Sequence, residues 1–476
     1  KCVKCKENTT VLIIRAGDAF CRGCFKEYFI HKFRAMLGKN RVIFPGEKVL
    51  LAVSGGPASS SMLSQVQEGL SRDAPKKLRF VPGIIYIDEG GASGQSMEER
   101  KRAVAQLESV FRATNYHYHI VHLEQVLSLP SSVLEAGSSA TGKPPTGSSY
   151  KAAVDHLIPT RKNQNQHPDL SVENAQSHLS NLSMQEVQNG VTSPITPEHT
   201  QALKRLFASV RTPTAKEDLL HTLRQHLILH TARTQGYTKV MMGDSCSRLA
   251  IKLLSNISLG RGASLATDTG FSDPRHGDVV IVRPMRDYSS KEIAYYNRMF
   301  DIPSVFIPGL DSKAQDKASI QRLTESFVTK LQTDFPSTVS TIYRTSEKLH
   351  TACPPQNTNT QLSAKCLLCV CALDTKLGES HCQCTKMASH HGNGLYSLNK
   401  NTQYCVCSFR EPETVDLKSL LCYSCRLTIK DMTALDALPQ YILSEAERRR
   451  SQMREEISEF LLDEEEDEAI PRVNGS

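Results

Sequence analysis

The sequence lacks any long apolar run. Nowhere in its 476 residues do about 18 consecutive apolar residues occur, the length that a membrane-spanning helix requires. Its start also lacks the apolar block behind a basic cap that marks a secretory signal. We therefore expect a chain that spans no membrane. Because the sequence opens on Lys1 without a methionine, we also expect residues to be missing upstream.

Cysteine is nearly absent from the middle of the chain. Although there are 15 cysteines, Cys246 is the only one between Cys24 and Cys353. A lone thiolate can carry a persulfide, but it can neither close a resolving disulfide nor hold an iron–sulfur cluster through three thiolates. Two interpretations of Cys246 follow: an inert small core residue, which we favour, and a sulfur relay.

Cys-x-x-Cys pairs occur near both ends, a pattern that favours metal thiolates in a reducing compartment, here the cytosol. Fifteen residues separate the two N-terminal pairs, which is the spacing of a closed, structural zinc site. The alternative is a redox dithiol, which would need one pair at a helix start and no matching second pair. The predicted zinc ligands at this end are Cys2, Cys5, Cys21 and Cys24.

A second structural zinc site is predicted in the last third of the chain, although 52 residues separate its two pairs. Further thiols lie between the pairs and could supply a ligand or another site. The predicted ligands are Cys366, Cys369, Cys422 and Cys425, and the additional thiols are Cys371, Cys382, Cys384, Cys405 and Cys407.

Positive charge is spread unevenly. The formal net charge is +7, but residues 443–476 hold 5 basic and 11 acidic residues, which leaves +13 on the rest. A basic body fits an RNA partner, and a merely soluble basic protein fits equally well. Residues 25–37 predict an amphipathic helix with a basic face that is either an RNA contact or simply solvated. The candidate RNA contacts there and just beyond are Lys26, Lys32, Arg34, Lys39 and Arg41.

Alternating strands and helices predict an α/β fold with a doubly wound parallel sheet, in which ligands bind beyond the carboxyl ends of the strands. The predicted strands are 49–53, 80–87, 116–123, 239–242 and 278–282, with helices between them. Asp88 and Glu89 follow the second strand, where a ribose or adenine could lie, although an ordinary polar strand end is preferred. Arg283 and Arg286 follow the fifth strand, as phosphate or RNA contacts or as surface ion pairs.

The first strand breaks into the small residues Ser54, Gly55 and Gly56 before a helix begins. Gly55 and Gly56 allow a turn whose amides, with the positive end of the helix dipole, would face an anion. A plain strand-to-helix connection is the alternative.

Four regions are predicted along the chain: an N-terminal zinc ribbon with a basic helix, an α/β domain, a C-terminal helical region with the second zinc site, and a charged helix with an acidic tail. Their bounds are 1–45, 46–310, 311–440 and 441–476. Residues of about 129–210 form an insert rich in Ser, Asn, Gln, Gly and Pro. We expect it to be largely disordered between 136 and 200, apart from helices predicted at its edges, at 150–158 and 202–210.

Three segments resemble a known superfamily. The run Ser54-Gly55-Gly56-Pro57-Ala58-Ser59 resembles the Ser-Gly-Gly-x-Asp-Ser pyrophosphate loop of enzymes that use ATP to adenylate a carbonyl oxygen, with Ala58 in place of Asp. Residues 240–250 resemble that superfamily's later glycine turn, at Gly243 and without its later Asp. Residues 283–286 and 290–293 resemble its "RPL … KEI" segment. With the cysteine pairs, the chain resembles the cytoplasmic tRNA 2-thiolation protein 2 family from about Cys2 to Cys425, apart from the insert.

The resemblance implies an adenine nucleotide alpha-hydrolase-like (PP-loop) fold with a degenerate nucleotide site. Ala58 offers no oxygen to magnesium and Pro57 removes one amide donor, so ATP and Mg would bind only weakly or through a partner. The implied nucleotide-site residues are Ser54, Gly55, Gly56, Ser59, Ser60 and Gly243.

The resemblance also implies a role: a non-catalytic subunit that pairs with a catalytic tRNA thiouridylase paralogue. The complex would thiolate the wobble uridine of cytosolic tRNAs for lysine, glutamate and glutamine, with sulfur from a thiocarboxylated ubiquitin-like carrier. One alternative is an autonomous ATP-dependent tRNA sulfurtransferase that tolerates Ala58. Another is a zinc-stapled scaffold without a tRNA role, against which the retained turns at Gly55 and Gly243 argue.

Overall fold

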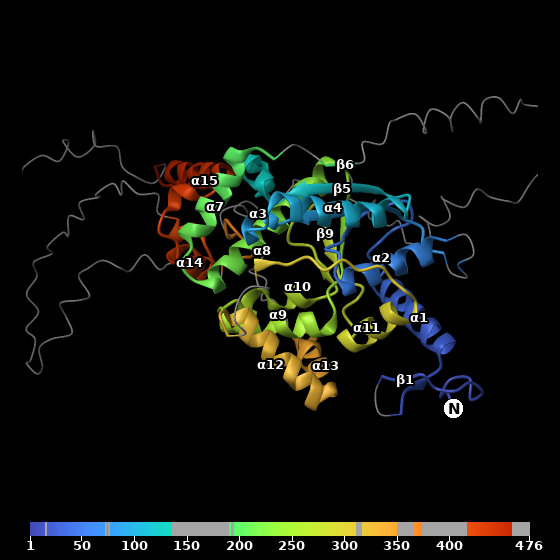
Figure 1. Ribbon diagram of the computed structural model, residues 1–476. Coiled ribbons are helices and arrows are strands. Elements are labelled where there is room, and N and C mark those ends of the chain that lie inside the picture. The colour runs from blue at the N-terminus through green and yellow to red at the C-terminus, as the bar shows by residue number, and fades with distance from the viewer. Residues whose placement is uncertain are drawn as a thin grey trace, which may run out of the picture.

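A seven-stranded sheet forms the centre of the computed structural model (Figure 1). The structure describes residues 1–14, 17–71, 74, 77–135, 190–191, 195–310, 317–349, 365–373 and 417–458. The strand order is β6-β5-β4-β3-β7-β9-β8, and every neighbouring pair is parallel except β8 and β9. The strands are β3 (Lys48–Ala52), β4 (Val81–Asp88), β5 (His117–His122), β6 (Gly190–Val191), β7 (Lys239–Met242), β8 (Ser272–Asp273) and β9 (Val280–Val282).

The doubly wound parallel sheet predicted from the sequence is therefore confirmed. Alternate residues of the central strands bury themselves in two separate cores, one on each face. Leu50 and Val240 belong to one core, whereas Val49, Leu51 and Met241 belong to the other. A sheet covered on both faces explains why these strands appear as continuous apolar runs in the sequence.

Helices cover the two faces, and their starts follow local capping rules. Ser96 and Ser289 each form a capping box, with Glu99 and Glu292 respectively. The helices of four or more residues in the described chain are α1 (Arg22–Asn40), α2 (Pro57–Leu70), α3 (Gly90–Ser93), α4 (Met97–Arg112), α7 (Pro197–Ser209), α8 (Pro213–Thr234), α9 (Cys246–Ser258), α10 (Leu265–Thr269), α11 (Ser290–Met299), α12 (Ile320–Asp334), α13 (Pro336–Thr345), α14 (Tyr423–Lys430) and α15 (Gln440–Ser458), and η1 (Leu123–Ser128) is a 3-10 helix.

The N-terminal ribbon and the last described helices, α14 and α15, lie at opposite sides of the molecule (Figure 1). At the N-terminus, β1 (Leu12–Ile13) and β2 (Ala19–Phe20) form a small antiparallel ribbon before α1. At the other side, α14 and α15 lie beside α7 and α8 and share their apolar core. The pair α12 and α13 packs on α9 around a separate small core that includes Leu249, Val328 and Tyr343.

Part of the expected insert is ordered. Residues 190–191 add β6 to the sheet edge, and α7 covers most of the stretch from 197 to 210. Residues 129–135 of the insert are also described and include the 3-10 helix η2 (Ser131–Val133). Residues 136–189 and 192–194, which include the helix predicted at 150–158, lie outside the described residues, as does the acidic run at 463–468. None of the described helices is long and apolar enough to cross a membrane.

Candidate functional site

The loop after β3 is a tight turn held by its own serines. Gly55 has φ +82°, a conformation that favours glycine, and Gly56 is the N-cap of α2 with Pro57 at its first turn. The Ser59 hydroxyl donates to the Gly56 carbonyl at 3.0 Å, and the Ser60 hydroxyl donates to the Gly55 carbonyl at 3.2 Å. Four of the predicted nucleotide-site residues therefore close one turn.

Gly243 brings a second loop against the first. A Cβ at Gly243 would lie 2.9 Å from the Cα and 3.0 Å from the amide nitrogen of Ser59, so only glycine fits there. The two loops follow β3 and β7, the neighbouring strands at which the direction of winding reverses. In open α/β sheets this is where ligands bind. The structure thus gathers all six predicted nucleotide-site residues in the two loops that follow β3 and β7.

Residues from a distant part of the sequence hold one side of the loop at 54–59, here called the phosphate-type loop. The Val305 amide donates to the Gly55 carbonyl at 2.9 Å, and Asn297 donates to the Pro57 carbonyl at 2.9 Å. The Ser61 hydroxyl donates to the side-chain oxygen of Asn297 at 2.6 Å. Sequence patterns gave no sign of these contacts, because they join residues more than 200 positions apart.

Cys246 lies at the start of α9 but is inaccessible. Its side chain is 4% exposed, and its backbone amide donates to the Tyr288 carbonyl at 2.9 Å. Burial raises the pKa of the Cys246 thiol to about 11. Since the thiolate is the nucleophile, a thiol held neutral at pH 7 is poorly suited to relay sulfur. These surroundings are those of an inert core residue.

The acidic residues after β4 are bound in a buried ion-pair network. Asp88 accepts hydrogen bonds from Arg100 at 2.8 Å and from the Gly90 amide at 2.9 Å, and lies 2.9 Å from Nδ1 of His122. Arg100 also makes a bidentate contact with Glu124 at 2.6 and 2.9 Å. Burial alone would raise the pKa of the Asp88 carboxyl, but His122 and Arg100 outweigh it and lower the pKa.

Glu89 is occupied in a similar way, because Arg224 of α8 makes a two-point ion pair with it. Asp88 and Glu89 therefore connect β4 to α4, η1 and α8. Sequence reasoning missed the cations Arg100 and Arg224. A signal for Arg100 existed: it shares the inner face of α4 with Leu107 and Phe111, and a charge on an apolar face implies a buried partner.

Arg283 and Arg286 are not surface residues. They are 2% and 6% exposed, and their guanidinium groups donate to backbone carbonyls around α10. Arg283 also lies 3.3 Å from the Asp244 carboxylate. The expectation that these two arginines face RNA or form surface ion pairs is thus corrected, because both side chains are buried against α10.

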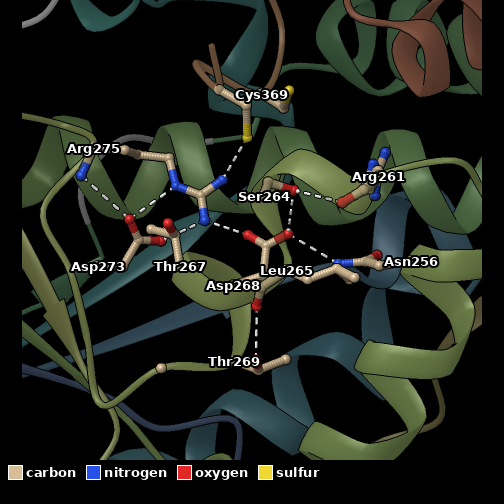
Figure 2. Close-up of polar contacts among 12 residues, drawn as sticks. Asn256, Arg261, Ser264, Leu265, Thr267, Asp268, Thr269, Asp273, Arg275 and Cys369 are labelled. Carbon is tan, nitrogen blue, oxygen red and sulfur yellow. Dashed lines mark hydrogen bonds and ion pairs between the residues drawn. The ribbon is translucent and has the colours of Figure 1, made fainter. Parts of the chain in front are cut away.

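A second polar network surrounds Asp268 and Arg275 (Figure 2). Asp268 of α10 accepts from Asn256 and from the Ser264 hydroxyl, both at 2.9 Å, and pairs with Arg275. Arg275 reaches Asp273 as well and donates to the Cys371 thiol at 2.7 Å. Arg275 therefore connects the segment that carries Cys366 and Cys369 to the sheet.

Each four-cysteine set is brought together as predicted. In both sets the four sulfur atoms lie within 4.8 Å of one another. The sulfurs of Cys5 and Cys21 are 3.9 Å apart, and those of Cys369 and Cys422 are 3.6 Å apart. Four thiolates around one tetrahedral zinc ion would be about 3.8 Å apart, given a Zn–S bond of about 2.3 Å. Either set could therefore hold a metal ion.

The local folding of the two sets is alike. One pair in each set sits on a turn, and the other begins a helix: Cys21 is the N-cap of α1 and Cys422 the N-cap of α14. A helix start stabilises the negative charge of a thiolate. Cys371 lies beside the second set, whereas Cys353, Cys382, Cys384, Cys405 and Cys407 lie outside the described residues.

The basic residues of α1 have different surroundings. Lys32 is turned inward, with its ammonium 2.7 Å from the buried carboxylate of Glu292 and 4.7 Å from the centre of the Tyr288 ring. Lys26 and Arg34 are half-buried, whereas Lys39 and Arg41 are exposed. Of the five predicted RNA contacts, Lys32 is held as part of the interior.

The sequence was compared with known proteins. The family model of cytoplasmic tRNA 2-thiolation protein 2 matches residues 319–427. Proteins of that name are 61% identical in Danio rerio and 50% identical in Homo sapiens, and each comparison covers 98% of this chain. These alignments span 95% and 94% of the two relatives. The chain belongs to this family.

A cytoplasmic tRNA 2-thiolation protein 2-A of Xenopus laevis is also similar, at 54% identity over 98% of this chain and 95% of its own length. Among solved structures, the U34-tRNA thiolase NcsA from Methanococcus maripaludis, determined with its 4Fe-4S cluster, superposes with a TM-score of 0.46 at 15% identity. That comparison covers 79% of this chain and 97% of NcsA.

Proposed function

We propose that this protein is a non-catalytic subunit of a heterodimeric, cytoplasmic tRNA 2-thiolation complex. Its relatives are named cytoplasmic tRNA 2-thiolation proteins, and it shares their sequence over almost its whole length. A catalytic paralogue with an intact phosphate loop would be its partner. The substrates would be the wobble uridines of tRNAs for lysine, glutamate and glutamine, and a thiocarboxylated ubiquitin-like protein would supply the sulfur.

One observation carries the proposal: both loops are kept, but the residues at positions 58 and 246 offer neither the oxygen nor the reactive thiol that the chemistry needs. Adenylation by ATP needs an anionic oxygen for magnesium, and residue 58 is an alanine. Sulfur transfer needs a reactive thiol, and Cys246 is buried with a raised pKa. The carboxylates after β4 are engaged with Arg100 and Arg224.

We infer that each four-cysteine set binds one structural zinc ion. All four sulfurs of a set lie within 4.8 Å, which suits ligands that share one metal. In a four-iron cluster each thiolate binds a different iron, so the four sulfurs would stand further apart than they do around one metal ion. Bound zinc would close the N-terminal ribbon onto α1 and fix α14 to the turn at Cys366.

The exposed and half-buried basic residues of α1 are the proposed tRNA contacts. Lys39 and Arg41 are exposed at the end of α1, and Lys26 and Arg34 are half-buried along it. Phosphate contacts of this kind give affinity without sequence preference and weaken with salt. Lys32 would act through α1, by holding its orientation.

The test is a reconstitution with wobble-uridine tRNA, ATP and a sulfur donor. Three samples are compared: this chain alone, the candidate catalytic paralogue alone, and the two mixed. Thiolation by the mixture only would support a required non-catalytic subunit. Thiolation by this chain alone would show it to be the enzyme, and full activity of the paralogue alone would remove the subunit role.

A further inference from the structure

Phe306 stands out on the surface of the described chain. Its side chain is 84% exposed, more than that of any other large apolar residue that the structure describes. The flanking residues Val305 and Ile307 are partly buried against the core on the α1 side of the sheet. Inward and outward positions thus alternate along an extended segment, which aims Phe306 at solvent.

The segment that carries Phe306 is pinned on both sides of the ring. The Val305 amide donates to the Gly55 carbonyl at 2.9 Å, and the Gln95 side chain donates to the Pro308 carbonyl. The segment follows α11 and runs across the molecule toward α8 (Figure 1). An aromatic ring on a fixed segment loses little conformational freedom when a ligand stacks on it.

The segment that carries the ring contacts the phosphate-type loop and follows a helix with exposed basic residues. Val305, its neighbour, contacts Gly55 of the phosphate-type loop. The exposed face of α11 carries Lys291, Tyr295 and Arg298, with the Lys291 ammonium 5.9 Å from the centre of the Tyr295 ring. Where α11 ends, Arg22 and Lys26 of α1 lie over the Phe300 ring, at 5.4 and 5.9 Å.

We propose that Phe306 is a stacking platform for an unpaired base of the tRNA. This inference rests on the proposed function and names the contact that would hold a base beside the phosphate-type loop. Aromatic rings among cations are how proteins bind single-stranded nucleic acid: the ring stacks on a base while lysine and arginine contact the phosphates. Arg22, Lys26, Lys291 and Arg298 supply the phosphate contacts.

The surroundings favour RNA over a protein partner. Hot spots of protein interfaces are anchors within a larger apolar patch. The two residues next to Phe306 in the sequence, Val305 and Ile307, turn inward. The next residue on each side, Ser304 and Pro308, is exposed. Phe306 is the only large apolar residue between 300 and 310 whose side chain is exposed, so the segment offers a single ring, which suits one base.

The experiment measures the affinity of the full-length protein, alone and with its partner subunit, for a lysine tRNA. A second series of tRNAs carries one abasic position in the anticodon loop, moved through each loop position in turn. The variants are Phe306→Ala and Phe306→Tyr, and Phe335→Ala is the matched control. Phe335 is another exposed phenylalanine, 61% exposed, at the junction of α12 and α13.

We expect Phe306→Ala to bind the intact tRNA about tenfold more weakly, the effect of one lost stacking contact. One abasic position should weaken binding by the unchanged protein to a similar extent and abolish the effect of Phe306→Ala. Phe306→Tyr and Phe335→Ala should bind like the unchanged protein, and all variants should melt at its temperature.

Three results would overturn the proposal. In the first, Phe306→Ala binds tRNA normally while Lys39→Ala weakens binding, which leaves the tRNA role intact. In the second, Phe306→Ala loses the protein partner and keeps its own tRNA affinity, which makes Phe306 a protein contact. In the third, the unchanged protein binds no tRNA, either alone or together with its partner subunit, which also rejects the proposed function.

Discussion

The Lys32 ammonium lies 2.7 Å from Oε1 of Glu292, a carboxylate whose side chain is 1% exposed. This ion pair joins α1 to α11, and Glu292 also accepts a hydrogen bond from the Tyr28 hydroxyl at 3.0 Å. Phe29 stacks on Tyr296 beside it, with ring centres 3.9 Å apart. The N-terminal module is therefore anchored to the α/β domain through the body of α1.

The variant Lys32→Ala should destabilise the protein by about 3 kcal/mol, because it leaves the buried Glu292 charge without its cation. The measurement is urea unfolding of the full chain. Lys39→Ala, on an exposed lysine of the same helix, is the control. It should leave the free energy of unfolding unchanged and weaken tRNA binding. Equal stability of the two variants would show that Lys32 is not an anchor.

Arg100→Met should lower the free energy of unfolding by about 3–5 kcal/mol. The reason is that the buried carboxylates of Asp88 and Glu124 lose the guanidinium group that both of them contact. Lys101→Met, at the adjacent position with a side chain 69% exposed, is the matched control. Thermal melting of both variants checks the prediction. An Arg100→Met protein as stable as the control would mean that the network contributes nothing to folding.

Cys425→Ser should reduce the zinc content of the purified protein from two ions to one and lower its melting temperature. The reason is that metal binding to such a site contributes directly to folding. Cys2→Ser should do the same at the other set, and Cys246→Ser, on the buried thiol of α9, is the control that keeps two ions. Unchanged melting of Cys425→Ser with lost thiolation would contradict a structural role.

His276 should make stability depend on pH. It is 3% exposed, and burial lowers its pKa from 6.5 to about 3. Between pH 6.5 and pH 3 this imidazole is protonated in the unfolded chain and neutral in the folded chain. The free energy of unfolding therefore decreases as the pH falls from about 6.5. At pH 5 this difference amounts to about 2 kcal/mol.

The check on His276 is urea unfolding at pH 7 and pH 5. His276→Asn should lose less stability over that interval than the unchanged protein does. His117→Asn, at an exposed histidine, is the matched control. If His276→Asn kept the full pH dependence, other groups would cause it.

Ala58→Asp should not create ATP hydrolysis in this chain. The new carboxylate could contact magnesium, but Pro57 still offers no amide and the Val305 contact still ties down the loop. Hydrolysis is measured on the isolated protein, with the catalytic paralogue as the positive control. Vigorous hydrolysis would mean that a single residue had silenced the site.

Much of the fold follows from local pattern. The five longer strands, the helices around them and both four-cysteine sets were predictable because apolar periodicity and ligand spacing are properties of short segments. The strands β6 and β8 were not, because two residues carry no periodicity. The helix predicted at 202–210 is present as α7 but begins earlier than expected, because Thr196 caps it at Pro197.

The candidate site was predictable in position and not in detail. Glycine turns after β3 and β7 had to meet if the sheet was parallel, and they do. The inward turn of Lys32, the burial of Arg283 and the ion pairs of Arg100 depend on partners far away in sequence. A charged residue in a sequence does not reveal whether its partner is solvent, RNA or another side chain.

The contact between Gly243 and the backbone of Ser59 bears on how silent subunits are recognised. A side chain at position 243 would push α2 away from β7 whether or not a nucleotide ever bound at these loops. Packing alone therefore demands this glycine. A glycine turn of this kind can therefore be retained in a protein that no longer binds the ligand, so its presence in a sequence does not show that the protein is active.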